Sequence, residues 1–169
     1  GALLLTQSHA SNPFGMNIDF SGASPNGTSN HFFLCEDSTA TRVVFRSNGG
    51  LANFSANDVN LSDERLKDVS GPLASTWDAI KGLDIVDYRY KDSQDTRMLA
   101  GVVAQQVVKV APRLFSENGW ADGEHHAIYE QSLWMFGIKA LQEAQGRIET
   151  NEQKIERLIA RIDELEATA

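Results

Sequence analysis

Apolar residues recur every seven positions near the C-terminus, and this spacing constrains the fold more than any other feature. The first series is Leu141, Ile148, Ile155 and Ile162, and the second, three residues later in each repeat, is Ala144, Asn151, Leu158 and Leu165. Such a narrow seam over about four heptads predicts a long helix, residues 128–169, that packs against other helices. The alternative is an amphipathic helix that packs on its own domain, which would show a wider apolar face.

Charged residues flank this seam in a pattern that predicts chain orientation. Arg147 and Arg161 fall at the g positions, and Glu152 and Glu166 fall at the e positions that follow. In a parallel, in-register assembly these opposite charges meet across chains. The number of chains stays open, because isoleucine at a with leucine at d also occurs in dimers and Asn151 fixes only the register.

Residues 1–61 have a different composition, rich in Gly, Ser, Asn and Thr. Short strands are predicted at 16–20, 32–34 and 42–46, because apolar runs there are separated by Ser-Pro-Asn-Gly and Ser-Asn-Gly-Gly turns. Strands this short carry too little apolar surface for a core of their own. Association between copies would supply the missing contacts.

Residues 62–127 read as a small mixed domain. The elements expected are a short helix after Asp63, a second helix from Pro72 to Gly82, a strand pair at 86–90 and 98–103, and a helix that ends at Pro112. The first of these helices begins at Ser62-Asp63-Glu64, where a capping side chain and acidic residues favour a helix start. By itself this segment would be an ordinary, solvated helix N-terminus.

The same segment also contains a candidate nucleophile and base, Ser62 and Lys67. A serine hydroxyl needs a base to remove its proton, and a lysine can do so only when burial or nearby cations disfavour its charged form. Arg65 would assist this, whereas Asp63 and Glu64 would oppose it. Five residues do not stack two side chains on one helix face. Either Ser62 lies just outside the helix, or the pair forms between chains.

Several motifs, in order, resemble those of the endosialidase-type intramolecular chaperones, which are self-cleaving Ser-Lys peptidases at the ends of phage tail spikes, tail fibres and neck appendages. Ser62-Asp63-x-Arg65-x-Lys67 is similar to the S-D-x-R-x-K signature of that family. Residues 83–91 (LDIVDYRYK) resemble its strand ending in an aromatic residue and a lysine, and residues 101–112 (GVVAQQVVKVAP) its Gly-Ala-Gln run followed by a helix and proline. Residues 128–143 resemble the start of its closing helix.

The resemblance implies an α+β fold in three parts: a β-rich end of a fibre or spike in 1–61, a helix-and-hairpin chaperone region in 62–127, and a coiled-coil helix in 128–169. It also implies an intertwined, parallel homotrimer. Ser62 would attack the carbonyl carbon of Leu61 with Lys67 as base, so that the chain is cut between Leu61 and Ser62. These are the catalytic residues and the cleavage site that the family predicts here.

The implied partners are other copies of this chain, the upstream fibre or spike domains as folding client, and a host-surface receptor contacted through residues 1–61. The implied locations are the virion for the N-terminal segment and the infected host cytoplasm for the released chaperone. Two alternative functions involve no self-cleavage. One is an uncleaved, trimeric fibre tip, and the other is a generic coiled-coil scaffold.

Composition argues against several other classes of protein. A formal net charge of −8 does not fit a nucleic-acid partner, and no apolar run is long enough for a membrane span. Cys35 is the only cysteine, so no internal disulfide can form. His125 and His126 suggest a metal site near Asp122 and Glu124, but adjacent histidines without a third ligand at zinc spacing are more typical of a solvated loop. No cofactor is expected.

Trp77 and Trp134 lie in apolar helical patterns and are predicted to be core residues, whereas Trp120 is predicted to lie in a loop.

Overall fold

The computed structural model describes residues 15–55, 59–117, 119 and 123–168, together with residues 6 and 8. The chain divides into two compact units. The first comprises residues 1–62 and 88–99, and the second comprises residues 63–87 and 100–169. Small sheets and one long helix make the fold α+β, as predicted. The predicted division into 1–61, 62–127 and 128–169 stays a prediction.

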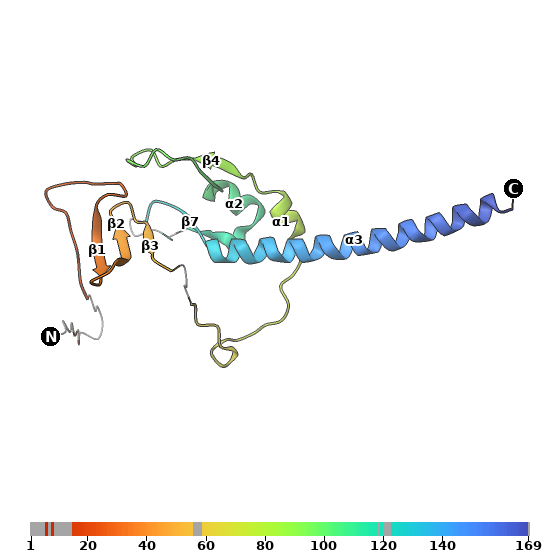
Figure 1. Ribbon diagram of the computed structural model, residues 1–169, viewed down its shortest axis with the longest axis horizontal. Helices are drawn as coiled ribbons and strands as arrows, with labels where there is room; N and C mark the ends of the chain where they lie inside the picture. The colour runs from red at the N-terminus through yellow and green to blue at the C-terminus, as the bar shows by residue number, and fades with distance from the viewer. Residues whose placement is uncertain are drawn as a thin grey trace. The chain divides into compact units, whose positions relative to one another are not determined.

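The first unit contains a three-stranded antiparallel sheet in the order β1-β2-β3 (Figure 1). Its strands are β1 (His31–Glu36), β2 (Thr41–Arg46) and β3 (Leu51–Asn53). Phe33 pairs with Phe45 across the first two strands, and their rings meet edge to face at 5.9 Å between centroids. Most large apolar side chains of this sheet are exposed in the single chain, which leaves it without a closed core.

The strand predicted at 16–20 is wrong. Residues 15–20 have no strand structure, and Phe20 instead stacks on Phe32 with ring centroids 4.7 Å apart. An alternating pattern marks a chain suited to a sheet, but a strand forms only where a neighbour accepts its hydrogen bonds. The strands predicted at 32–34 and 42–46 are confirmed as parts of β1 and β2.

The second unit contains most of the helices. Its elements are η1 (Glu64–Leu66), α1 (Trp77–Lys81), α2 (Ala104–Val110), η2 (Pro112–Leu114), β6 (Phe115–Ser116), β7 (Ala127–Ile128) and α3 (Glu130–Glu166). β4 (Val86–Tyr88) and β5 (Leu99–Gly101) lie where the chain passes from one unit to the other. β4 and β5 form one two-stranded sheet, and β6 and β7 form another. Val107, Ala111, Leu114 and Phe136 are the buried apolar cluster, so this small core joins α2 and η2 to the first turns of α3.

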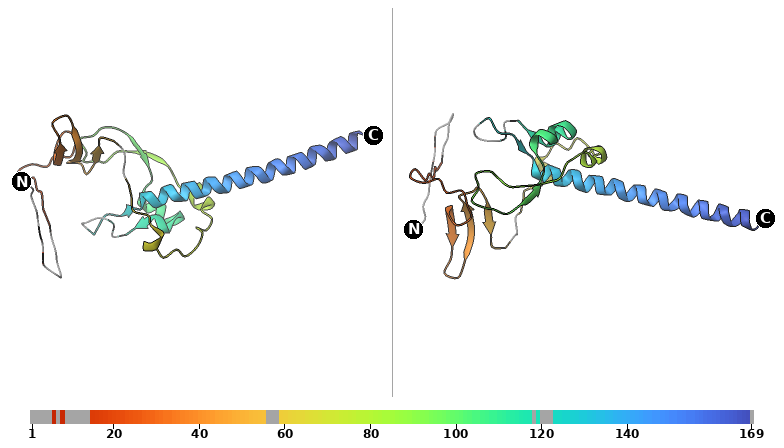
Figure 2. Two further views of the ribbon diagram at one scale, coloured as in Figure 1. Left: turned by 60° about the horizontal axis from the view of Figure 1, so that its bottom comes forward. Right: turned by 90° about the horizontal axis from the view of Figure 1, so that it is seen from above.

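The long helix α3 confirms the helix predicted from the heptads, with ends at residues 130 and 166. Residues 145–166 are exposed throughout in the single chain. Figures 1 and 2 show the C-terminal half of α3 extending beyond the other elements of its unit. The seam therefore lies uncovered in the isolated chain. Among the described residues, no helix is long and apolar enough to cross a membrane.

The helix predicted from Pro72 to Gly82 is wrong in its first half. Residues 67–76 are not helical, and α1 begins only at Trp77, although it ends at Gly82 as predicted. The physical reason is that Thr76 is bonded to α3. Its backbone N–H, which would donate within a helix that began near Pro72, donates instead to Glu143 Oε1 at 3.1 Å, and its hydroxyl donates to the carbonyl oxygen of Phe136 at 2.8 Å.

Trp134 is not a core residue, contrary to the prediction. Its side chain is 61% exposed, because it lies seven residues before Leu141 and so continues the seam side of α3. Trp77 is half-buried. Trp120 lies outside the described residues.

Truncating Leu114 to alanine is expected to destabilise the second unit. Leu114 is 1% exposed in the core, so its removal leaves a cavity that costs about 2–5 kcal/mol. Urea unfolding at fixed protein concentration would measure this cost. Ile85→Ala is the matched control, because Ile85 is 68% exposed and its loss should change the free energy of unfolding by less than about 0.5 kcal/mol. Equal effects for both truncations would contradict the assigned core.

Candidate active site

The predicted scissile bond lies in an exposed, irregular stretch of chain. Residues 59–63 form neither helix nor strand, and both Leu61 and Ser62 are exposed. The boundary between the two compact units falls directly after Ser62. Cleavage between Leu61 and Ser62 would thus separate the chain one residue before the second unit begins.

The turn η1 fixes the backbone between Ser62 and Lys67. Asp63 caps it, because its carboxylate accepts from the backbone N–H of Arg65 at 2.9 Å. The backbone N–H of Lys67 donates to the carbonyl oxygen of Glu64 at 3.1 Å. Lys67 itself has extended backbone angles, so the helix expected here is a single 3-10 turn. Aspartate is a favoured capping residue, which is why the sequence signalled the start correctly.

Charges within this turn largely compensate one another. The guanidinium of Arg65 binds both carboxylate oxygens of Asp63, with an Nη2–Oδ2 distance of 2.5 Å. The bond to Arg65 lowers the pKa of Asp63, and the bond to Asp63 raises the pKa of Arg65. Because Arg65 is exposed, the pair contributes little to stability. Arg65 was expected to disfavour a charged lysine nearby, but Asp63 engages that positive charge.

The predicted nucleophile and base belong to different compact units. Ser62 is the last residue of the first unit and Lys67 lies in the second, and both side chains are exposed in the single chain. Their pairing as a catalytic dyad stays a prediction. Lys67 is exposed in the single chain, whereas a lysine acts as a base only where burial or nearby cations disfavour its charged form.

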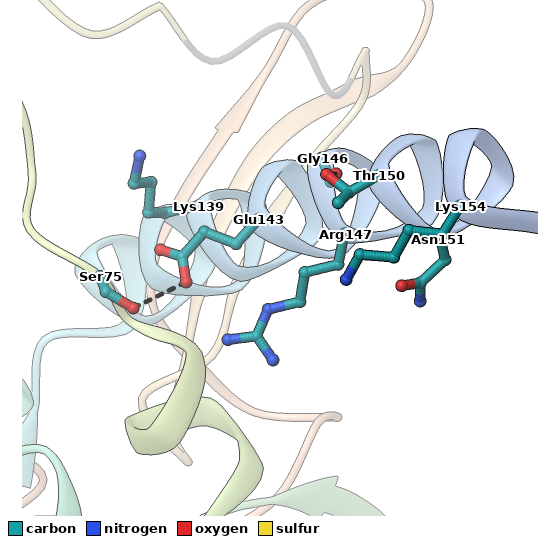
Figure 3. A pocket seen from close by; sticks show the side chains of 8 residues that line it. All are labelled: Ser75, Lys139, Glu143, Gly146, Arg147, Thr150, Asn151 and Lys154. Atoms are coloured by element: carbon teal, nitrogen blue, oxygen red, sulfur yellow. Dashed lines mark hydrogen bonds between the residues drawn. The ribbon is translucent and has the colours of Figure 1, made fainter. Parts of the chain in front are cut away.

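Sequence reasoning missed a set of contacts that ties the chain after Lys67 to α3. The Ser75 hydroxyl donates to Glu143 Oε2 at 2.7 Å, and the backbone N–H of Thr76 donates to Glu143 Oε1 at 3.1 Å (Figure 3). The guanidinium carbon of Arg147 lies 4.0 Å from the ring centroid of Trp77. We call residues 75–77 together with Glu143 and Arg147 the clamp. Its partners are more than 60 residues apart, so no local pattern could reveal it.

The histidine pair shows no metal-binding arrangement in the described part of the chain. His126 Nδ1 lies 3.0 Å from the backbone oxygen of Glu117, and its ring packs on Phe115. No group of three or more His, Cys, Asp or Glu side chains that could hold a metal occurs among the described residues. Asp122, which the sequence placed near this pair, lies outside them.

Comparison with known families supplies the decisive observation. Residues 62–116 match the family of the chaperone of endosialidase. That family is classed among peptidases, and the matched residues begin at Ser62 and extend through β6. We call residues 62–116 the chaperone segment. No curated protein matches the chain.

The match confirms the resemblance seen in the sequence and gives the chaperone segment a chaperone role in general terms. It covers η1, α1 and α2, together with the exposed turn that contains Ser62 and Lys67. The β-rich residues before Ser62 and the helix α3 lie outside the matched range.

Proposed function

We propose that this chain is an intramolecular chaperone that forms a parallel homotrimer, folds the fibre or spike segment before it, and then releases itself by cutting between Leu61 and Ser62. The observation that carries the proposal is that the chaperone segment begins at Ser62. Ser62 is the serine that would act as the nucleophile. The cleavage would thus separate the client from the chaperone at the start of the matched range.

The reaction proceeds in two steps. Ser62 Oγ attacks the carbonyl carbon of Leu61 while Lys67 Nζ accepts the hydroxyl proton. The C–N bond between Leu61 and Ser62 breaks, the amine of Ser62 takes a proton, and the Leu61 acyl group is left as an ester on Oγ. Water then hydrolyses this ester and frees residues 62–169. Each chain is cut once, so the step is a single turnover on the protein itself.

Apolar side chains around the bond support a site that is completed by assembly. Val59, Leu61, Leu66 and Val69 are each at least 70% exposed in the single chain. Exposed apolar residues clustered within eleven positions indicate a surface that another protein covers. Covering this segment would also remove water from Lys67, which is the condition that lets a lysine act as a base.

The uncovered seam of α3 supports association of copies. Ile148, Ile155, Ile162, Leu158 and Leu165 are all more than half exposed, although they form one continuous stripe. A helix with such a stripe gains stability by packing against identical helices. A dyad that becomes active only in the assembly would not cut chains whose client is still unfolded. A cut made after folding would leave the folded client kinetically trapped, because the chaperone that assembled it is gone.

Intact mass under denaturing conditions tests the cleavage. We expect the freshly folded wild type to yield two products, residues 1–61 and residues 62–169, and Ser62→Ala to remain one chain. Ser70→Ala is the matched control and should be cut like wild type, because Ser70 is an exposed serine in the same stretch. A single full-length mass for wild type would refute self-cleavage and favour the uncleaved fibre tip.

A further inference from the structure

The clamp holds the chain that follows Lys67 on one side of α3. Residues 68–72 are all exposed, Leu73 packs against the core, and the clamp residues follow at once. Thr76 is 2% exposed, and its hydroxyl bond to the Phe136 carbonyl is the buried anchor of this stretch. The clamp thus fixes the point on α3 from which the chain leads back to Lys67.

Glu143 is the centre of the clamp because one carboxylate receives two donors. Its oxygens accept from the Ser75 hydroxyl and from the Thr76 backbone. Hydrogen bonds to an ionised carboxylate are stronger than those between neutral groups. They favour the charged form, and the Ser75 bond is the main cause that lowers the pKa of Glu143. Loss of this carboxylate would leave the buried neighbour Thr76 with one bond fewer.

Arg147 adds a second contact one helical turn further along. Residues four apart lie on the same helix face, so Arg147 projects beside Glu143 and reaches the ring of Trp77 in α1. Figure 3 shows both side chains on the helix, with Ser75 joined to Glu143. A cation over a tryptophan ring is attractive, and more so when the site is shielded from water.

The same two turns of α3 also form the start of the uncovered seam. Arg147 occupies the g position between Ala144 and Ile148, where a parallel neighbour would bring its Glu152. A groove of about 660 Å³ runs along α3 here, and Ser75, Glu143 and Arg147 of the clamp are among the residues that line it. Assembly of α3 would therefore act directly on the residue that stacks on Trp77.

We propose that Glu143 and Arg147 are positioning residues for the self-cleavage, and that the clamp transmits assembly of α3 to the segment that carries Lys67. The inference rests on the proposed function. It assigns no chemical step to either residue. Instead, both set the distance and orientation of the lysine relative to the bond that it helps to cut. Small displacements of a catalytic group lower the reaction rate strongly, since a shift of about 1 Å can reduce it roughly 100-fold.

The test compares cleavage rate with assembly in the full chain. Glu143→Ala and Arg147→Ala should each slow the appearance of the two products by at least about tenfold. In the uncut Ser62→Ala background, the same changes should leave the sedimentation mass and the helix content of the assembly unchanged. Arg147→Lys should recover most of the rate, because lysine also places a cation over Trp77. Ser75→Ala combined with Glu143→Ala should be no slower than the slower single variant.

Glu149→Ala and Arg157→Ala are the matched controls. Glu149 and Arg157 lie on α3, are exposed, and occupy the b and c positions of the heptads, away from the seam and its charged flanks. Both controls should be cut at the wild-type rate. Cleavage of Glu143→Ala at the wild-type rate, or a loss of rate matched by an equal loss of assembly, would contradict the positioning role of the clamp. Neither result would contradict the proposed function. An uncut wild type would overturn the proposed function as well.

Discussion

Aspartate in place of both Ile148 and Ile155 is expected to convert the assembled protein to monomers and to stop self-cleavage. Both isoleucines are more than half exposed in the single chain, so the change costs the isolated helix little. In a packed seam, however, each aspartate would bury a charge without a partner, at a cost of several kcal/mol per ion. Because roughly 1.4 kcal/mol is a tenfold change in an equilibrium constant, association should fall by more than about 1000-fold.

Sedimentation and intact mass on the same samples would measure this effect. Gln153→Asp combined with Ala160→Asp is the matched control, since it adds the same two charges to the same stretch of α3 at f positions, away from the seam. The control should stay assembled and be cut. Persistent assembly of the Ile148 and Ile155 variant would show that the heptads do not form the interface, and cleavage in its monomers would refute assembly-dependent activation.

Methionine in place of Lys67 is expected to abolish cleavage while the assembly persists. Methionine keeps an unbranched side chain of similar reach but cannot accept a proton, and loss of a general base typically costs roughly 100- to 10,000-fold in rate. Lys67→Arg should fail as well, because a guanidinium is not deprotonated in proteins. The side chain of Lys67 is exposed in the single chain, so neither change should disturb folding.

A time course of product formation beside Lys81→Met would check this prediction. Lys81 is an exposed lysine at the end of α1, and its loss should leave the rate unchanged. Cleavage of Lys67→Met at the wild-type rate would exclude Lys67 as the base and redirect the search to another proton acceptor in the assembly.

The exposed Ser62–Lys67 stretch and the clamp differ in how far the sequence could reveal them. Asp63 caps η1 as expected, because capping depends on a side chain and a backbone N–H only two residues away. By contrast, Glu143 is bound by Ser75, 68 residues earlier. Interactions at that separation carry no periodic signal, so only the folded chain shows them.

The sequence by itself determined the long helix and its seam, the turns around β1 and β2, and the family of the segment that begins at Ser62. Each of these depends on local spacing or on ordered motifs. Only the tertiary structure decided that α1 starts at Trp77 rather than near Pro72 and that residues 16–20 form no strand. In both, contacts or missing neighbours distant in the chain outweigh local preference, because a strand needs a hydrogen-bonded partner and a helix start yields to tertiary bonds such as those of Thr76.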